Sequence, residues 1–261
     1  MPEKFMENVK VVSQEMLSEG IFSLRLQTGQ IAAHARCGQF VSVYSSDTAR
    51  LLPRPISICE AEKETGILRL VYRIAGKGTE EFSHLQAGDT VRILGPLGNG
   101  YPVDRMDENK TAFLIGGGIG VPPLVQLAKS LPGRKIAVVG YRDSNLFLKE
   151  DLEAAGAEVV IATEDGSVGT KGNVLDTIRE NGLKADVIYS CGPTPMLRAL
   201  KAYAQEAGTE CWLSLEQRMA CGVGACLACV CQSKEKDEHS QVNNKRICAE
   251  GPVFNADEIE L

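Results

Sequence analysis

The sequence predicts a multi-domain chain with β and α/β parts: an antiparallel β domain, a doubly wound parallel α/β domain and a small cysteine-rich C-terminal region. Three observations support this prediction: short alternating strands between turn residues, a later succession of apolar strands and helices, and cysteines gathered near the C-terminus. A chain of 261 residues is long enough for two domains and a small appendage. We place the domain boundaries at residues 1–103, 104–213 and 214–261.

Charge and composition restrict the partners. A net charge of −6 and a pI near 5.3 argue against a nucleic acid or an anionic membrane surface. No apolar leader follows Met1, and no apolar run reaches the roughly eighteen residues of a membrane-spanning helix. We therefore expect a cytoplasmic chain, in which nine cysteines serve as ligands, buried thiols or catalytic groups rather than as disulfides.

Short strands fill the first hundred residues. Apolar and polar side chains alternate over residues 22–26, 40–43 and 68–72, with glycine-containing turns between these runs. A further strand over residues 88–94 leads into an exit rich in glycine and proline. Several short strands at this spacing, without long helical periodicity, predict an antiparallel barrel or sandwich.

Three segments of this domain suit a bound diphosphate. The first joins the planar fork of an arginine to a proline-fixed backbone and a serine hydroxyl. The second ends a strand with an aromatic ring and a cation, and the third opens an expected helix whose amides can face an anion. Each alone also fits a surface arginine, a core tyrosine or a helix cap, but their order ahead of a nucleotide-type domain indicates a cofactor site. The residues are Arg54, Pro55, Ile56, Ser57, Val71, Tyr72, Arg73, Gly78 and Thr79.

From about residue 110 strands and helices alternate. Residues 111–115 form a continuous apolar run typical of a buried parallel strand, and a glycine-rich turn and a helix beginning near Pro123 follow. Further strands are expected at residues 136–140, 159–163, 187–190 and 211–215, with helices between them. Such a sheet places ligands beyond the carboxyl ends of its strands. The turn contains Gly116, Gly117, Gly118 and Gly120, where a dinucleotide's phosphates could approach the backbone, although it lacks the GxGxxG spacing.

A second landmark of this domain is Cys191, followed by Gly192 and Pro193 at the end of the 187–190 strand. A thiol there lies where the reactive ring of a bound nicotinamide is expected, although a buried cysteine before a proline-started helix is the plain alternative. The glycine-rich turn in the same domain favours the functional interpretation. Arg142 could pair with a 2′-phosphate and Asp143 with a 2′-hydroxyl, so these residues leave the choice of NADP or NAD open.

The cysteines near the C-terminus follow a recognised spacing. Cys221, Cys226, Cys229 and Cys248 match the C-x4-C-x2-C…C pattern of plant-type [2Fe–2S] clusters. Glycine and alanine fill the loop between them, so that backbone can wrap closely around the inorganic sulfides. Zinc is the alternative, because Cys226 and Cys229 also form half of a zinc knuckle. The polar run over residues 233–246 is expected to be a solvated hairpin or loop.

The order of these motifs resembles that of the ferredoxin–NADP reductase superfamily, which joins a flavin-binding Greek-key barrel to a nicotinamide-binding α/β domain. Residues 216–229 and 248–254 narrow the resemblance. Over essentially its whole length the chain is similar to the electron-transfer subunits of NAD-dependent, type B dihydroorotate dehydrogenases. The resemblance implies FAD at the first site, NAD at the glycine-rich turn and at Cys191, Gly192 and Pro193, and a [2Fe–2S] cluster on the four cysteines. Cys231 is then a free thiol.

The resemblance also implies partners and a reaction. An FMN-containing catalytic subunit would oxidise dihydroorotate, in a heterotetramer with two copies of each chain, and electrons would pass through the cluster and FAD to NAD⁺. The loop over residues 221–229 would dock the partner. No residue of this chain is expected to perform acid–base catalysis or to touch dihydroorotate. Pro122 departs from the alanine usual in the superfamily, and no terminal aromatic is present.

Two alternatives stay open. The chain could serve another partner, as in sulfite reductases or ferredoxin-dependent transhydrogenases. It could instead be a zinc-stabilised, redox-sensing module without turnover.

Overall fold

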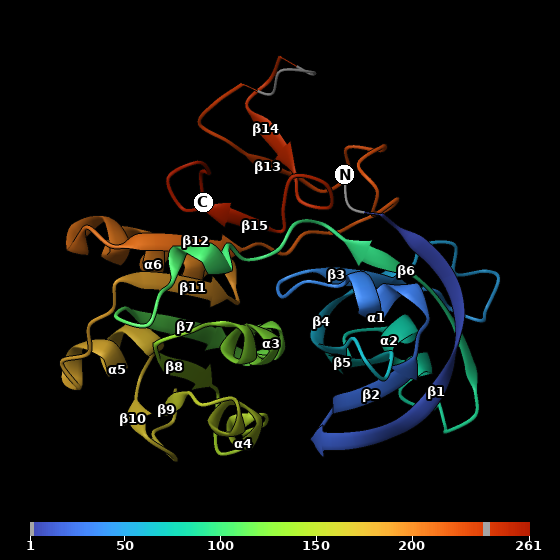
Figure 1. Cartoon of the computed structure of the whole chain (residues 1–261), viewed down its shortest axis with the longest axis horizontal. Coiled ribbons are helices and arrows are strands. Elements are labelled where there is room, and N and C mark those ends of the chain that lie inside the picture. Colours follow the sequence, from blue (N-terminus) through green and yellow to red (C-terminus); the bar gives the residue numbers. More distant parts are fainter. Residues whose placement is uncertain (1–2, 237–240) are drawn as a thin grey trace.

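Two lobes lie side by side, and the C-terminal segment lies across their top (Figure 1). The computed structural model describes residues 3–236 and 241–261. The chain passes from the first lobe to the second between Leu97, which ends the barrel, and Thr111, which begins the α/β sheet. Among the described residues no helix is long and apolar enough to cross a membrane.

The first lobe is a closed antiparallel barrel with the strand order β1-β2-β5-β4-β3-β6. Strands β3, β4 and β5 follow one another as neighbours and β6 returns beside β3, which is the Greek-key arrangement. The barrel is confirmed, and the sandwich alternative is wrong. Two short helices accompany it. The elements are β1 (Phe5–Ser18), β2 (Ile21–Gln27), α1 (Gln30–His34), β3 (Phe40–Val43), β4 (Arg54–Glu62), β5 (Ile67–Arg73), α2 (Lys77–Phe82) and β6 (Thr90–Leu97).

Alternation along the strands fills the barrel. Leu24 and Leu26 of β2 and Leu68 and Leu70 of β5 point inward and are almost fully buried. The long strand β1 pairs with β6 through its first half and with β2 through its second half, so one strand contributes to both edges that close the barrel.

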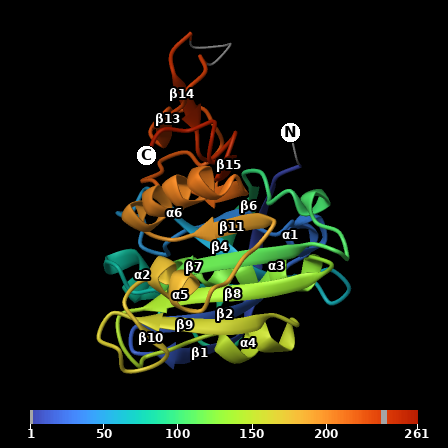
Figure 2. The ribbon, with the colours of Figure 1, turned by 90° about the vertical axis from the view of Figure 1, so that its left-hand side faces the viewer.

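The second lobe is a seven-stranded sheet with the order β10-β9-β8-β7-β11-β12-β15. Figure 2 shows these strands stacked from β10 up to β15. Helices α3 and α4 pack on one face and α5 and α6 on the other, as the doubly wound prediction requires. The elements before the C-terminal region are η1 (Val103–Arg105), β7 (Thr111–Gly117), η2 (Gly118–Gly120), α3 (Pro122–Ser130), β8 (Arg134–Tyr141), α4 (Lys149–Ala154), β9 (Glu158–Thr163), β10 (Thr170–Lys171), α5 (Val174–Glu180), β11 (Val187–Cys191), α6 (Thr194–Ala207) and β12 (Glu210–Ser214).

The strand order of this sheet reverses between β7 and β11. Their register places Gly116 beside Cys191 at the carboxyl ends of the two strands. A crevice at such a switch point is where open α/β sheets bind ligands. The two nicotinamide motifs predicted from the sequence therefore meet at one place.

The C-terminal region is joined to the α/β sheet. Strand β15 (Val253–Asn255) runs antiparallel to β12, with Val253 opposite Ser214. Between these strands the chain forms the cysteine loop and a small hairpin of β13 (Val230–Gln232) and β14 (Asn244–Arg246). The polar run over residues 233–246, expected to be a hairpin or loop, follows β13 and ends with β14, and its residues 237–240 lie outside the described residues.

Candidate functional site

A cavity of about 290 Å³ opens between the barrel and the segment after β12. Most of the residues predicted to bind the flavin line it: Arg54, Pro55, Ile56, Ser57, Val71, Tyr72, Arg73 and Thr79. The first four begin β4 and the next three end β5, so two neighbouring strands bring them together. Gly78 does not line the cavity and is buried beside it.

Gly78 gives room to the arginine. A Cβ at Gly78 would lie 2.6 Å from Nε of Arg54, so a larger residue would displace the guanidinium. Arg54 also donates from Nη1 to the carbonyl oxygen of Leu52 at 2.6 Å. Thr79 Oγ1 accepts hydrogen bonds from the amides of Ala75 and Gly76, which fixes the turn into α2. The guanidinium therefore lies at the start of α2, an arrangement that fits a diphosphate.

Tyr72 has a structural role as well as a place in the cavity wall. Its hydroxyl donates to Oε1 of Gln14 at 2.8 Å, and its ring stacks on Phe22 with 5.9 Å between ring centres. Burial raises the pKa of Tyr72 well above its usual value. The core-tyrosine interpretation therefore holds, and the part of Tyr72 that lines the cavity adds to an apolar wall suited to a flat ring system.

The glycine-rich turn packs against the segment after β11. A Cβ at Gly120 would lie 2.2 Å from the carbonyl oxygen of Cys191, and one at Gly117 would lie 3.0 Å from Cδ of Pro193. Only glycine permits this approach of two backbones. Ile119, in the middle of the turn, lines the flavin cavity, so the two predicted cofactor sites are contiguous.

Cys191 is a neutral thiol in the fold. It is 1% exposed, and burial raises its pKa to about 12. It is therefore unsuited to act as a thiolate nucleophile, and it does not line the flavin cavity. Neither Arg142 nor Asp143 lines the cavity. The Asp143 carboxylate accepts from the backbone and side-chain nitrogens of Asn145, both at 2.8 Å.

Sequence reasoning did not assign the far wall of the cavity. Ser214, the last residue of β12, lies there with Glu216, Gln217 and Met219 of the segment that follows. Burial raises the pKa of the Glu216 carboxyl, and nearby Arg73 offsets part of the effect. The rule that ligands lie beyond the carboxyl ends of strands could have found this segment.

The cysteine loop directs backbone amides at sulfur. The amide of Gly224 donates to Sγ of Cys248 at 3.1 Å, and the amides of Ala225 and Val223 donate to Sγ of Cys221 at 3.3 and 3.4 Å. Burial opposes ionisation of Cys221, yet these hydrogen bonds lower its pKa to about 6. Such N–H···S bonds fit thiolates that ligate iron.

Glycine in the loop is required by backbone conformation and by space. Gly222 and Gly224 have φ of 68° and 88°, in the left-handed region. A Cβ at Gly224 would also lie 3.0 Å from Cβ of Ala249. Cys229 and Cys248 are buried, whereas Cys226 is exposed at the surface of the loop. The loop thus has one side in the protein and one side at the solvent.

The observed cysteines are all free thiols among the described residues, and no three His, Cys, Asp or Glu side chains there converge as a single metal ion requires. A two-iron cluster has two separate iron atoms, so its four thiolates need not surround one point. Cys231 lies on β13, and burial raises its pKa to about 11.

The chain is similar to known protein families and to curated relatives. Residues 8–101 match the family described as an oxidoreductase FAD-binding domain, and residues 216–260 match the iron–sulfur cluster binding domain of dihydroorotate dehydrogenase B. A protein of Listeria monocytogenes serotype 4a is 46% identical over 257 residues, which cover 97% of this chain and 98% of the relative. A protein of Geobacillus thermodenitrificans is 44% identical over 259 residues, 98% of each chain. Both are named dihydroorotate dehydrogenase B (NAD(+)), electron transfer subunit.

Solved structures share the fold. A chain of an NADH-dependent reduced ferredoxin–NADP oxidoreductase, solved in work on flavin-based electron bifurcation, superposes with a TM-score of 0.85 at 27% identity, covering 97% of this chain and 90% of that one. A ferredoxin NADP⁺ reductase of Neisseria gonorrhoeae, solved with FAD and NADP, superposes with a TM-score of 0.66 at 14% identity. It covers 78% of this chain and 92% of that one, and it supports the fold alone.

Proposed function

Because the chain belongs to the family of electron-transfer subunits of NAD-dependent dihydroorotate dehydrogenase B, we propose that it carries electrons from a catalytic subunit to NAD⁺ in the oxidation of dihydroorotate. Sequence identity that extends over nearly the whole length of this chain and of its Listeria relative shows the family. Cys221, Cys226, Cys229 and Cys248 would hold a [2Fe–2S] cluster, which would supply one-electron transfer, and the cavity would hold FAD for hydride exchange with the nicotinamide.

One observation supports this route most directly. The cavity is lined by the barrel strands, by Ile119 of the glycine-rich turn, and by the segment from Ser214 to Met219. That segment ends two residues before Cys221. A flavin in the cavity would therefore lie between the nicotinamide site on one side and the cysteine loop on the other, in the order that electrons require.

The residues of this chain bind the cofactors and orient them. Bound FAD supplies storage of two electrons and hydride exchange with NAD⁺, and the cluster supplies one-electron transfer. Arg54 and the start of α2 would hold the diphosphate, Ile56 and Tyr72 would provide apolar wall for the flavin ring, and Cys191, at the end of β11, would lie at the nicotinamide site. The amides of residues 223–225 stabilise thiolate sulfur.

The partner is an FMN-containing catalytic subunit, and we propose a heterotetramer of two copies of each chain. The surface of the cysteine loop is the docking site, because electrons enter there and because its apolar side chains are open to solvent. Val223 and Leu227 are 37% and 52% exposed, and they flank the exposed Cys226. Nine free thiols fit a reducing compartment, and we propose the cytoplasm.

The test is an anaerobic assay of dihydroorotate-driven NAD⁺ reduction with this chain purified together with the FMN-containing subunit. NADH formation that is lost when this chain is omitted is the expected result. If the chain holds FAD and cluster and no NADH forms, a different partner, of the sulfite reductase or transhydrogenase type, takes its place. A colourless preparation that contains zinc and no flavin would instead support the redox-sensing module.

A further inference from the structure

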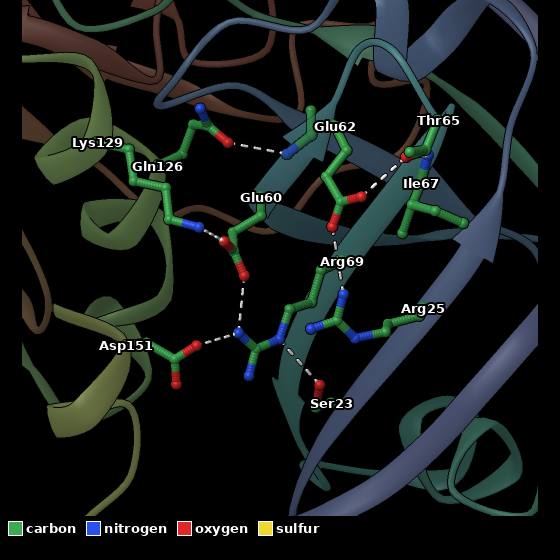
Figure 3. A network of polar contacts seen from close by, with 11 residues as sticks. Ser23, Arg25, Glu60, Glu62, Thr65, Ile67, Arg69, Gln126, Lys129 and Asp151 are labelled. Atoms are coloured by element: carbon green, nitrogen blue, oxygen red, sulfur yellow. Dashed lines mark hydrogen bonds and ion pairs between the residues drawn. The ribbon is translucent and has the colours of Figure 1, made fainter. Parts of the chain in front are cut away.

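Four charged side chains meet where the two lobes touch (Figure 3). Arg69 of β5 donates from Nη1 to Glu60 of β4 at 2.7 Å and also pairs with Asp151 of α4. Lys129 of α3 pairs with the second oxygen of Glu60. Two of these residues belong to the barrel and two to the α/β lobe, and we name the four together the interlobe clamp.

The clamp is desolvated at its centre and balanced in charge. The side chains of Arg69 and Glu60 are 5% and 9% exposed, and two cations face two carboxylates. Burial alone would raise the pKa of Glu60, but hydrogen bonds from Lys129 and Arg69 outweigh it and keep the pKa low. Nε of Arg69 is also bound, because it donates to Ser23 Oγ at 3.1 Å.

A buried ion network of this kind contributes little net stability, since desolvation offsets its attraction. Its directional bonds instead restrict geometry, because the planar guanidinium accepts partners only in fixed directions. Apolar packing between the lobes, in the core cluster that Cys59 and Val71 share with residues of α3, has no such direction. The clamp, together with the hydrogen bond from the Ala61 amide to Oε1 of Gln126 at 2.9 Å, therefore supplies directional contacts that can fix an angle between the lobes.

The elements that carry the clamp also carry the cofactor residues. Glu60 lies three residues after Ser57 on β4, and Arg69 lies two residues before Val71 on β5, or about 10 and 7 Å along the strands. Lys129 is on α3, whose start lies about 10 Å away next to the glycine-rich turn. A tilt at the clamp would thus move the nicotinamide site relative to the flavin site.

We propose that the interlobe clamp holds the α/β lobe at the angle that brings a bound nicotinamide into register with the flavin. Arg69, Glu60, Asp151 and Lys129 are positioning residues that act through α3, β4 and β5. The inference rests on the proposed function, since it assumes that FAD and NAD occupy the two contiguous sites.

The experiment compares the FAD- and cluster-loaded chain with a double variant, Asp151→Ala with Lys129→Ala. Asp151 and Lys129 are the two clamp residues of the α/β lobe, and their side chains are 31% and 47% exposed. Their removal therefore leaves the buried Arg69–Glu60 pair intact. Arg25→Ala removes a solvent-exposed ion pair with Glu62, which joins two strands of the barrel. Lys149→Ala removes a solvent-exposed pair with Glu153 on the same helix, α4. Both are matched controls, because neither pair joins the lobes.

Two quantities are measured. Stopped-flow absorbance gives the rate of flavin reduction by NADH and the dissociation constant of NADH. Time-resolved fluorescence of Trp212, the chain's single tryptophan and a residue of β12, reports energy transfer to the flavin across the lobes. We expect the double variant to reduce its flavin about tenfold more slowly, with FAD content and NADH dissociation constant within twofold of wild type, and to show a broader distribution of Trp212 lifetimes.

The controls are expected to match wild type in both measurements. A wild-type reduction rate in the double variant would overturn the proposal, and so would unchanged Trp212 lifetimes. If the double variant loses FAD, the single variant Asp151→Ala is judged by the same two criteria. A wild-type chain that NADH does not reduce would count against the proposed function, while the Trp212 lifetimes would still test the clamp.

Discussion

Arg246 donates from Nη1 to the carbonyl oxygen of Gly224 at 2.9 Å, across the cysteine loop. The other side of the same peptide group is the amide of Ala225, which donates to Sγ of Cys221 at 3.3 Å. A carbonyl that accepts a hydrogen bond polarises its peptide and strengthens the N–H as a donor. Arg246 is itself held by Glu250, which accepts from Nε at 2.9 Å and from the Arg246 backbone amide at 2.6 Å. Two neighbouring side chains thus fix one peptide of the loop.

Substitution of Arg246 is expected to lower the reduction potential of the cluster. Arg246→Ala removes a cation and weakens one N–H···S bond, so the more negative reduced cluster is less stabilised. A loss of about 1 kcal/mol corresponds to a shift on the order of 40 mV for one electron. An EPR-monitored redox titration measures the midpoint. Lys245→Ala, which breaks an exposed ion pair with Glu258, is the control and should leave the midpoint unchanged; equal shifts in the two variants would contradict the role of Arg246.

The ligand set predicts opposite results for two nearby cysteines. Cys248→Ala should abolish the cluster, because Sγ of Cys248 receives the Gly224 amide inside the loop. Cys231→Ala should keep it, since this thiol lies on β13 and outside the C-x4-C-x2-C…C spacing. Iron content, acid-labile sulfide content and visible absorption show whether each variant still holds the cluster. Cluster loss in Cys231→Ala would mean that the ligands are assigned wrongly.

The two glycines on either side of Ile119 should respond differently to alanine. Gly120→Ala would place Cβ 2.2 Å from the carbonyl oxygen of Cys191, so the backbones must separate, and NADH should no longer reduce the flavin at a measurable rate. Gly118→Ala meets no atom within 4 Å and carries only the strain of φ 52°, about 1 kcal/mol. The two variants are compared by their stopped-flow rate of flavin reduction by NADH and by their flavin content. A normal reduction rate in Gly120→Ala would show that this contact does not shape the nicotinamide site.

Glu81 makes a prediction that depends on pH. It accepts hydrogen bonds from Ser46 at 2.7 Å and pairs with Ser45 and Arg50, which anchors the loop ahead of Arg54. Burial would raise the pKa of Glu81, but these bonds lower it to about 2. The stabilisation is therefore complete above the usual value of 4.5 and is lost as the pH falls toward about 2.

Glu81→Gln should accordingly be less stable than wild type at pH 7, and the difference should shrink as the pH falls below about 4.5. Urea unfolding at pH 7, 5 and 3.5 measures it, with Glu80→Gln, a neighbour on the same helix, as the control. A difference that stays constant over this range would mean that Glu81 does not stabilise the loop through its charge.

Much of the architecture could be predicted from local patterns. The strand at Phe40–Val43 shows clear alternation, and the apolar run from Thr111 continues into a glycine-rich turn, so both were placed correctly. No strand is predicted over residues 5–18 or 54–62, where the structure has β1 and β4. Pro55 is unusual in a strand interior, and here it stands near the first residue of β4. Strand β15 was also missed, since three residues give no periodicity and their pairing with β12 is set by the fold.

The site residues divide in the same way, into those that a local motif predicts and those that only the packed fold brings together. Arg54 and Cys191 stand in short motifs, and the order of these motifs along the chain indicates the cofactor sites. Glu216 lines the cavity only because the chain returns past the barrel after β12, and Asp151 reaches Arg69 only because α4 packs against β5. Contacts between segments so far apart in the sequence depend on how the lobes are packed, which no local pattern encodes.

The pairing of Ser214 with Val253 makes the cysteine region an insertion between two adjacent strands. Its two ends lie side by side, and its first residues up to Met219 line the flavin cavity. An insertion anchored at one edge of the sheet can change in length without altering the strand order of the lobe. Its first residues cannot change as freely, because they also form a wall of the flavin site.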